Sequence, residues 1–180
     1  REAEVQQNVG DRINNNPPAF PPLPRGYGWF EAYKRLYMYM DFMEGQNLEK
    51  VLETNGPLTL LEALQVGMEI CVVLRDYVHG YVDPAGRQVP IVHRDIKPAN
   101  IQRLTAGGTH CLLDFGLART AHLSAQTQLR QTKAGTEGFQ APEQKGMFGG
   151  RIGDYTDVLA LGATIYNLLT NDFLPIAHAE

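Results

Sequence analysis

The densest run of reactive side chains lies at residues 93–100, where HRDIKPAN follows an apolar pair. Within it, Asp95 can accept a proton from a hydroxyl group, and Lys97 can neutralise negative charge that develops on a phosphoryl group. The side chain of Asn100 offers a carbonyl oxygen, which hard cations such as Mg²⁺ take as a ligand. A solvated polar loop is the alternative, but six specified positions recur by chance only about once in 10⁷–10⁸ sites. We therefore interpret this stretch as a catalytic loop.

Two later segments carry weaker signals. In LLDFG at residues 112–116, the carboxylate of Asp114 stands at the expected end of a strand, and this suits metal coordination at a tight turn. An Asp close before a Gly is also common in plain turns, so this segment alone indicates little. The second segment has Gly135 and Thr136 followed by FQAPE at residues 139–143. It too carries little information by itself.

Taken together, in this order and spacing, the three segments resemble the catalytic loop, the metal-binding segment and the end of the activation segment of the protein kinase superfamily. Residues 135–144 and the run DVLALG at 157–162 look most like the bacterial, eukaryotic-like serine/threonine kinases. The resemblance spans nearly the whole chain and is strongest over residues 36–171. It implies an α+β, two-lobed fold with the nucleotide in the cleft. It also implies ATP and Mg²⁺ as cofactors, and transfer of the γ-phosphoryl group of ATP to Ser or Thr hydroxyls of a protein substrate.

The resemblance assigns chemical roles to four residues. Asp95 resembles the base that orients the substrate hydroxyl, and Lys97 resembles the γ-phosphate contact of Ser/Thr kinases. Tyrosine kinases usually lack a Lys at that position, so its presence favours Ser or Thr as the acceptor. Asn100 and Asp114 resemble the pair that holds two Mg²⁺ ions.

Other matches to kinases are structural. His93 and Phe115 resemble two members of the hydrophobic spine, and Gly116 completes the metal-binding turn. Asp157 resembles a buried Asp that braces the backbone of the catalytic loop. Glu143 resembles the Glu that normally pairs with an Arg near the end of the large lobe, and we expect that Arg to be missing from this chain.

A third group of matches concerns regulation. Arg94 before Asp95 resembles kinases that are switched on when this Arg meets a phosphate on the activation loop. Three hydroxyls are candidate phosphate acceptors: Thr127, Thr132 and Ser124. A merely solvated loop is an equal alternative for each of them. Thr136 resembles the residue that bonds the catalytic base and faces the substrate.

Residues 36–45 (LYMYMDFMEG) resemble the last strand of the small lobe and the hinge. Met40 would be the gatekeeper beside the adenine, and the backbone of Asp41 and Met43 would bond the adenine edge. Asn47 lies where a ribose contact often occurs. Without the downstream motifs, an ordinary buried strand would be the better interpretation of this segment.

The sequence departs from the kinase pattern around the nucleotide. Residues 1–5 resemble the middle of the regulatory helix, with Glu2 matching the Glu that pairs with the ATP-binding Lys, although a short Glu-rich helix is usually a solvated face. A spine Leu is expected where Gln6 stands, and apolar residues are usual where Gly26 and Gln102 stand. Gln102 takes the place of the adenine floor. No GxGxxG motif occurs in the chain, and no Lys precedes Glu2.

These departures favour a chain that carries only part of a kinase catalytic domain. We expect residues 1–43 to be a remnant of the N-terminal lobe with the hinge, and residues 44–180 a partial C-terminal lobe with the catalytic loop and activation segment. Alone, such a fragment would have little activity. A pseudokinase or regulatory binding module is the alternative, against which the intact Asp95, Asn100 and Asp114 argue. A small-molecule phosphotransferase of related fold is disfavoured, because those proteins lack the DFG and APE pairing found here.

Composition limits the remaining possibilities. The chain has 180 residues, 43% hydrophobic and 20% charged, with a formal net charge of −4. This is ordinary for a globular domain and offers no field for nucleic acid or an anionic membrane surface. No apolar run reaches the ~18–20 residues of a membrane span. Cys71 and Cys111 lack CxxC spacing, which fits a reducing compartment, and we expect both to be buried. We therefore predict a cytoplasmic protein, or the cytoplasmic part of a larger membrane-anchored one.

Hydrophobic periodicity predicts the elements that must position these residues. We expect strands at 27–30, 36–42 and 112–113, helices at 1–9, 47–53 and 59–79, and a further helix from 156 or 157. Thr59 and Glu62 have the spacing of a capping box at the start of the long helix. Its predicted apolar positions are Leu61, Leu64, Met68, Cys71 and Val72. The proline-rich residues 14–24 predict a loop or an extended linker within the fold, with a proline-rich ligand for another domain as the less favoured alternative. The polar residues 119–136 predict a flexible loop.

Overall fold

The computed structural model describes residues 23–80, 82, 85–120 and 135–175. The helix predicted at 1–9 and most of the proline-rich stretch lie outside these residues. So do Glu2 and Gln6, and the three candidate phosphate acceptors. None of the helices in the described ranges is long and apolar enough to cross a bilayer.

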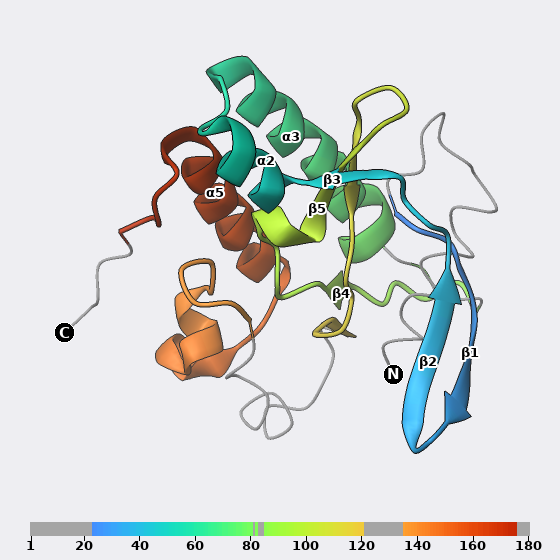
Figure 1. The fold of residues 1–180 in the computed structure, drawn as a ribbon. Coiled ribbons are helices and arrows are strands. Elements are labelled where there is room, and N and C mark those ends of the chain that lie inside the picture. Colours follow the sequence, from blue (N-terminus) through green and yellow to red (C-terminus); the bar gives the residue numbers. More distant parts are fainter. Residues whose placement is uncertain (1–22, 81, 83–84, 121–134, 176–180) are drawn as a thin grey trace.

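An antiparallel hairpin forms the first part of the described chain. β1 (Gly26–Ala32) pairs with β2 (Arg35–Met40), and the rings of Phe30 and Tyr37 stack with their centroids 5.3 Å apart. Figure 1 shows this hairpin projecting away from the helices. Both predicted strands are present, although the second ends at Met40 and not at residue 42 as predicted. Their aromatic side chains are about half exposed, so the alternative of a buried strand is wrong for this segment.

Two small sheets hold the segments on either side of the catalytic loop. The first is antiparallel, in the order β3-β5-β6, and its strands are β3 (Gly45–Asn47), β5 (Ile101–Leu104) and β6 (His110–Leu112). The second pairs β4 (Ile91–Val92) with β7 (Arg119–Thr120). The strand predicted at 112–113 therefore begins two residues earlier than expected. The loop predicted from 119 instead opens with a strand, because β4 supplies a backbone partner there.

The helices begin and end close to where the sequence predicts them. α2 (Leu48–Asn55) has Asn47 as its N-cap, and α3 (Leu60–Val73) begins with the predicted capping box. α3 runs on into a π-helical turn, η1 (Leu74–His79), which the periodicity did not indicate. α5 (Asp154–Thr170) starts at Asp154, two or three residues before the predicted start at 156 or 157. Three short 3₁₀ turns complete the elements: η2 (Pro98–Asn100), η3 (Pro142–Lys145) and η4 (Met147–Gly150).

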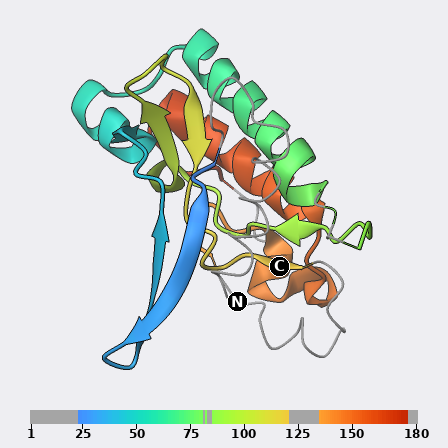
Figure 2. The ribbon, with the colours of Figure 1, turned by 90° about the vertical axis from the view of Figure 1, so that its right-hand side faces the viewer.

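Helices α3 and α5 pack side by side, as Figures 1 and 2 show from two directions, and both contribute to a hydrophobic core that also takes in residues of α2, η1 and the short strands β4, β5 and β6. α3 buries small and β-branched residues there: Ala63, Val66, Gly67, Ile70 and Val73. Its predicted apolar face is wrong, because Leu61, Leu64, Met68, Cys71 and Val72 are exposed. The reason is close approach, since a Cβ on Gly67 would lie 2.8 Å from Cδ1 of Ile165 on α5. The absence of a side chain at Gly67 thus allows this close approach to α5.

The two cysteines behave differently from each other. Cys111 on β6 is buried as predicted, and burial raises the pKa of its thiol to about 12. Cys71 on α3 is exposed, which contradicts the prediction, and it lines an open pocket together with Val158 and Leu161 of α5. Both are free thiols.

Candidate active site

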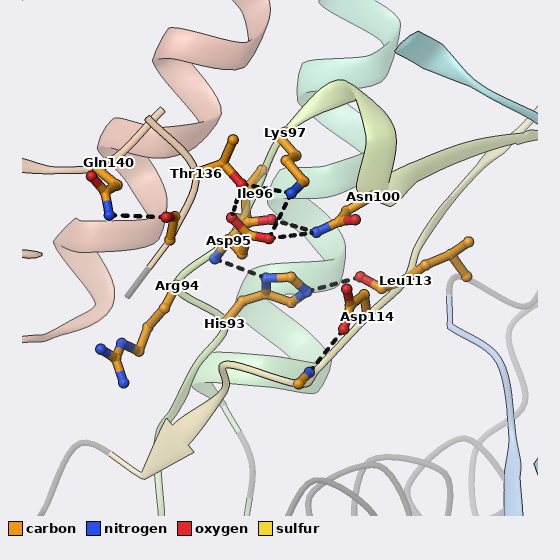
Figure 3. Close-up of polar contacts among 12 residues, drawn as sticks. His93, Arg94, Asp95, Ile96, Lys97, Asn100, Leu113, Asp114, Thr136 and Gln140 are labelled. Carbon is orange, nitrogen blue, oxygen red and sulfur yellow. Dashed lines mark hydrogen bonds and ion pairs between the residues drawn. The ribbon is translucent and has the colours of Figure 1, made fainter. Parts of the chain in front are cut away.

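The side chains expected to carry chemistry converge on the carboxylate of Asp95. Its Oδ1 accepts a hydrogen bond from Thr136 Oγ1 at 2.7 Å, and its Oδ2 lies 2.9 Å from Lys97 Nζ. Asn100 Nδ2 donates to the same Oδ2 at 3.1 Å and to the backbone oxygen of Asp95 at 2.8 Å. Figure 3 shows the four side chains pointing toward one another. The structure thus brings Thr136 next to Asp95 and Lys97, although Thr136 lies 36 positions beyond Asn100 in the chain.

This ring of contacts sets the protonation state of Asp95. Burial alone would raise the pKa of Asp95, but hydrogen bonds from Thr136 and Lys97, with the positive charge of Lys97, outweigh it. The pKa of the carboxyl group therefore lies below its usual value. An ionised carboxylate at neutral pH can orient a hydroxyl group and accept its proton.

Asn100 and Asp114 are linked through the backbone. Asn100 ends η2, and its backbone oxygen accepts a hydrogen bond from the N–H of Leu113 at 2.8 Å. The next residue, Asp114, has a left-handed backbone (φ 63), and its Oδ1 accepts from the N–H of Gly116 at 3.0 Å. Because the amide nitrogen of Asn100 is used on Asp95, its carbonyl oxygen remains for another partner. Within the described ranges, no cluster of three or more His, Cys, Asp or Glu side chains forms a self-contained metal site.

His93 connects the catalytic loop with the DFG segment. Its ring is fully buried, Nε2–H donates to the backbone oxygen of Leu113 at 3.0 Å, and Nδ1 accepts from the N–H of Asp95 at 3.3 Å. The ring also meets Phe115 edge-on, with centroids 4.7 Å apart. Burial lowers the pKa of His93, so the neutral form fits these two hydrogen bonds. The contact expected between His93 and Phe115 is present.

Asp157 on α5 binds the backbone of the expected catalytic loop through its carboxylate. Its two carboxylate oxygens accept from the N–H groups of His93 and Arg94, each at 2.8 Å. His79, at the end of η1, donates to the same carboxylate at 2.8 Å. Asp157 is fully buried, so these three donors provide the hydrogen bonds that water would make to an exposed carboxyl group. Arg94 itself has φ 74, and Figure 3 shows its side chain pointing away from Asp95.

Three further residues support the loop and were not singled out from the sequence. They are His79, Gln144, whose Nε2 donates to the backbone oxygen of Arg94 at 2.8 Å, and Thr164, whose Oγ1 donates to that of Ile96 at 3.2 Å. Thr164 and Gln144 are polar residues at buried positions, which is the feature that could have pointed to them. Only the folded chain, however, shows that these positions are buried. No sequence pattern links His79 to a carboxylate 78 residues away.

Residues 135–143, expected to end the activation segment, pack against the same loop. Gly135 has φ +116, and a Cβ there would lie 3.0 Å from the backbone oxygen of Arg94, so glycine fits this close approach. Glu143 is buried and accepts a hydrogen bond from Thr156 Oγ1 at 2.6 Å. Thr156, near the start of α5, is thus a partner for Glu143 that the sequence did not indicate.

The residues expected around the adenine lie at the junction of the hairpin and the β3-β5-β6 sheet. Asp41 follows β2, and its side chain accepts from Tyr27 OH at 2.6 Å and from the N–H of Arg25 at 3.0 Å. Asn47 uses its side-chain oxygen to cap α2. Gln102 Nε2 donates to the backbone oxygen of Met43 at 2.8 Å. Met40 is the last residue of β2, directly before Asp41 in the chain, and it is 36% exposed.

Comparison with known proteins agrees with this geometry. The family model for the protein kinase domain matches residues 19–179. Serine/threonine-protein kinases B and F of Synechocystis sp. are 33% identical over 177 residues and 35% identical over 175 residues; each match covers 94% of this chain but only 27% and 33% of those proteins. Serine/threonine-protein kinase PknB of Mycobacterium tuberculosis is 33% identical over 138 residues, which are 76% of this chain and 20% of that protein. The chain spans about a third or less of the length of these relatives. It belongs to the protein kinase family, and it is similar to the bacterial serine/threonine kinases.

Proposed function

We propose that the protein carrying this chain transfers the γ-phosphoryl group of ATP to Ser or Thr hydroxyls of protein substrates. The observation that supports this most is the carboxylate of Asp95, held ionised between Thr136, Lys97 and Asn100. The similarity to proteins named serine/threonine kinases supports the class of acceptor.

In the proposed reaction, the substrate hydroxyl oxygen attacks the γ-phosphorus while its proton passes to a carboxylate oxygen of Asp95. The bond from the γ-phosphorus to the bridging oxygen breaks, and ADP leaves. Lys97, only 21% exposed and tethered to Thr136 Oγ1 at 2.6 Å, places a positive charge beside the reacting groups. A partly buried charge of this kind stabilises a developing phosphoryl charge more strongly than the same charge in water.

Asn100 and Asp114 would hold the Mg²⁺. A carboxylate and an amide oxygen are hard ligands, and Mg²⁺ usually takes one or two such protein groups and completes its shell with water and phosphate oxygens. Two protein ligands without a larger acidic cluster therefore fit Mg²⁺ in the described part of the chain. When bound, the ion neutralises charge on the phosphate oxygens.

The remaining site residues take supporting roles in this proposal. Met40, the backbone of Asp41 and Met43, and Asn47 would surround the adenine and ribose. Arg94 would meet a phosphate on the activation segment. We assign residues up to 43 to the small lobe and hinge, and residues from 44 onward to the large lobe. The projection of the hairpin from the helical body in Figures 1 and 2 supports this division.

A kinase-like binding module without turnover is a second candidate. One observation favours it: the side chain at the expected adenine floor is the amide of Gln102, which is bonded to the hinge backbone. Nucleotide binding without phosphorylation of any protein would distinguish this candidate from a kinase.

The decisive experiment replaces the base. We expect Asp95→Asn to lower kcat about 10²–10⁴-fold in protein phosphorylation with Mg-ATP, because the amide cannot accept the proton. Glu53→Gln, which neutralises an exposed carboxylate on α2, is the matched control and should retain wild-type turnover. Equal activity of the Asp95→Asn variant and the wild type would refute the assignment of the base.

A further inference from the structure

Gln102 makes a contact that an apolar side chain at its position could not make. It stands where the resemblance to kinases leads one to expect the apolar floor of the adenine site. Its amide nitrogen instead donates to the backbone oxygen of Met43 at 2.8 Å, 59 residues earlier in the chain. Met43 belongs to the segment whose backbone is expected to bond the adenine edge. Gln102, at the expected floor of the adenine site, is thus hydrogen-bonded to the expected hinge.

The strand pairing holds Gln102 in reach of the hinge. β3 and β5 are antiparallel, with Asn47 opposite Gln102 and Gly45 opposite Leu104. The strands come so close that a Cβ on Gly45 would run into the backbone oxygen of Arg103. The N–H of Thr105 also donates to the backbone oxygen of Glu44 at 2.9 Å, which fixes the residue after Met43. The distance between Gln102 and Met43 is therefore set by backbone contacts on both sides.

The rest of the hinge is fixed from the hairpin. The N–H of Asp41 donates to the backbone oxygen of Arg25 at 2.9 Å, and the Asp41 side chain is held by Arg25 and Tyr27. Among the residues that the structure describes, none accepts a hydrogen bond from the N–H of Met43. At Met43 the hinge therefore offers a base its donor, while Gln102 already occupies one of the two acceptor positions of the carbonyl oxygen and competes with a base for it.

The two purines make different demands on such a hinge. Adenine presents an acceptor ring nitrogen next to its amino donor, and it can use the N–H of Met43 without needing that residue's carbonyl group. Guanine presents its O6 acceptor beside the N1–H and amino donors, an edge that matches the N–H and the carbonyl oxygen of one residue. A donor that must give up water without finding a free acceptor costs binding free energy.

We propose that Gln102 is a specificity-determining residue that withholds the Met43 carbonyl and thereby favours ATP over GTP. The proposal rests on the proposed function, since it requires the purine to lie at the hinge. The polar side chain of Gln102, where an apolar residue is usual, would then contribute to nucleotide selectivity.

Gln102→Leu tests this directly, because Leu has nearly the same size and cannot donate a hydrogen bond. We expect the ratio of kcat/KM for ATP to kcat/KM for GTP to fall about tenfold. This factor corresponds to the free energy of the one hydrogen bond that guanine would gain with the Met43 carbonyl oxygen. The change should appear mainly as a lower KM for GTP, since Gln102 does not touch Asp95. A purely structural loss would lower turnover with both nucleotides and leave the ratio unchanged, and that result would overturn the proposal.

Gln46→Leu is the matched control, because Gln46 is exposed on the neighbouring strand β3, opposite Arg103. It should keep the wild-type ratio. If Gln102→Leu does not fold, Gln102→Glu provides the second variant: an ionised carboxylate cannot donate to Met43, so the ratio should fall again. A wild-type protein that neither uses nor binds ATP and GTP would overturn both the proposed function and this inference. A wild-type protein that uses ATP, with variants of unchanged ratio, would overturn this inference alone.

Discussion

At the scale of single residues, the hydroxyl of Thr136 links the two charges of the site. It donates to Asp95 at 2.7 Å and accepts from Lys97 Nζ at 2.6 Å, while Lys97 also contacts the other carboxylate oxygen of Asp95. The three side chains form a closed ring in which each holds the other two. Because such a network lies in a partly buried site, the loss of one member weakens the remaining contacts as well.

The first prediction at this scale concerns the acid limb of the pH–rate profile. Thr136→Val keeps the shape of the side chain but removes the hydrogen bond that helps to keep the pKa of Asp95 low. The pKa of Asp95 should therefore rise, and because the proposed reaction needs the ionised carboxylate, the acid limb of kcat should move to higher pH. We also expect kcat to fall about tenfold at neutral pH, as for one hydrogen bond to a charged group.

Thr136→Ser keeps the hydroxyl and serves as the control for that measurement. Its acid limb should stay at the wild-type position. An unchanged acid limb in Thr136→Val would show that Thr136 does not set the protonation of Asp95.

At the scale of elements, the packing of α3 against α5 decides which face of α3 is buried. α3 carries apolar residues around most of its circumference, so periodicity alone allows more than one buried face. The larger side chains Leu61, Leu64 and Met68 have the helical spacing of a core face, yet they are exposed. The buried face instead carries Ala63, Val66, Gly67 and Ile70, and the Ile165 side chain of α5 comes close to Gly67.

A pair of glycine variants tests this packing. We expect Gly67→Val to lower the free energy of unfolding in urea by about 1–3 kcal/mol, because the added atoms must displace Ile165. Gly162 on α5 is also inside a helix, but a Cβ there meets no other atom within 4 Å. Gly162→Val is therefore the matched control and should stay close to wild-type stability, and Gly162→Ala should gain about 0.5–1 kcal/mol. Equal losses at Gly67 and Gly162 would contradict close helix packing as the cause.

At the scale of the whole molecule, the described chain consists of a helical body and a projecting hairpin. β1 and β2 pair only with each other among the described strands. A two-stranded hairpin is marginally stable by itself, and this one has half-exposed aromatic residues on its surface. The body, in contrast, has a continuous core that includes residues of α2, α3 and α5.

The chain's one tryptophan can report the two parts separately. Trp29 lies on β1 and is 56% exposed, so its fluorescence follows the hairpin, whereas far-UV circular dichroism follows the helices of the body. We expect the fluorescence change in a urea titration of this 180-residue chain to come at lower urea than the loss of helical signal, because the hairpin opens locally first. Coincident transitions would mean that hairpin and body unfold as one cooperative unit.

The sequence by itself determined the family and predicted which residues make up the candidate site. The HRDIKPAN, DFG and APE segments have a specific order and spacing, and such short motifs need no tertiary information to be read. The helix start at Thr59 and Glu62 and the two strands of the hairpin also follow from local rules, since caps, turns and alternation act over a few residues.

The tertiary structure alone decided which partners meet across long stretches of chain. The contacts of His79 with Asp157 and of Gln102 with Met43 join residues 78 and 59 positions apart, and the choice of buried face on α3 depends on α5. Each of these depends on how close two elements come, which is set by side-chain volume and backbone pairing across the whole fold. Local propensity carries no information about that distance, because it acts within a segment and not between segments.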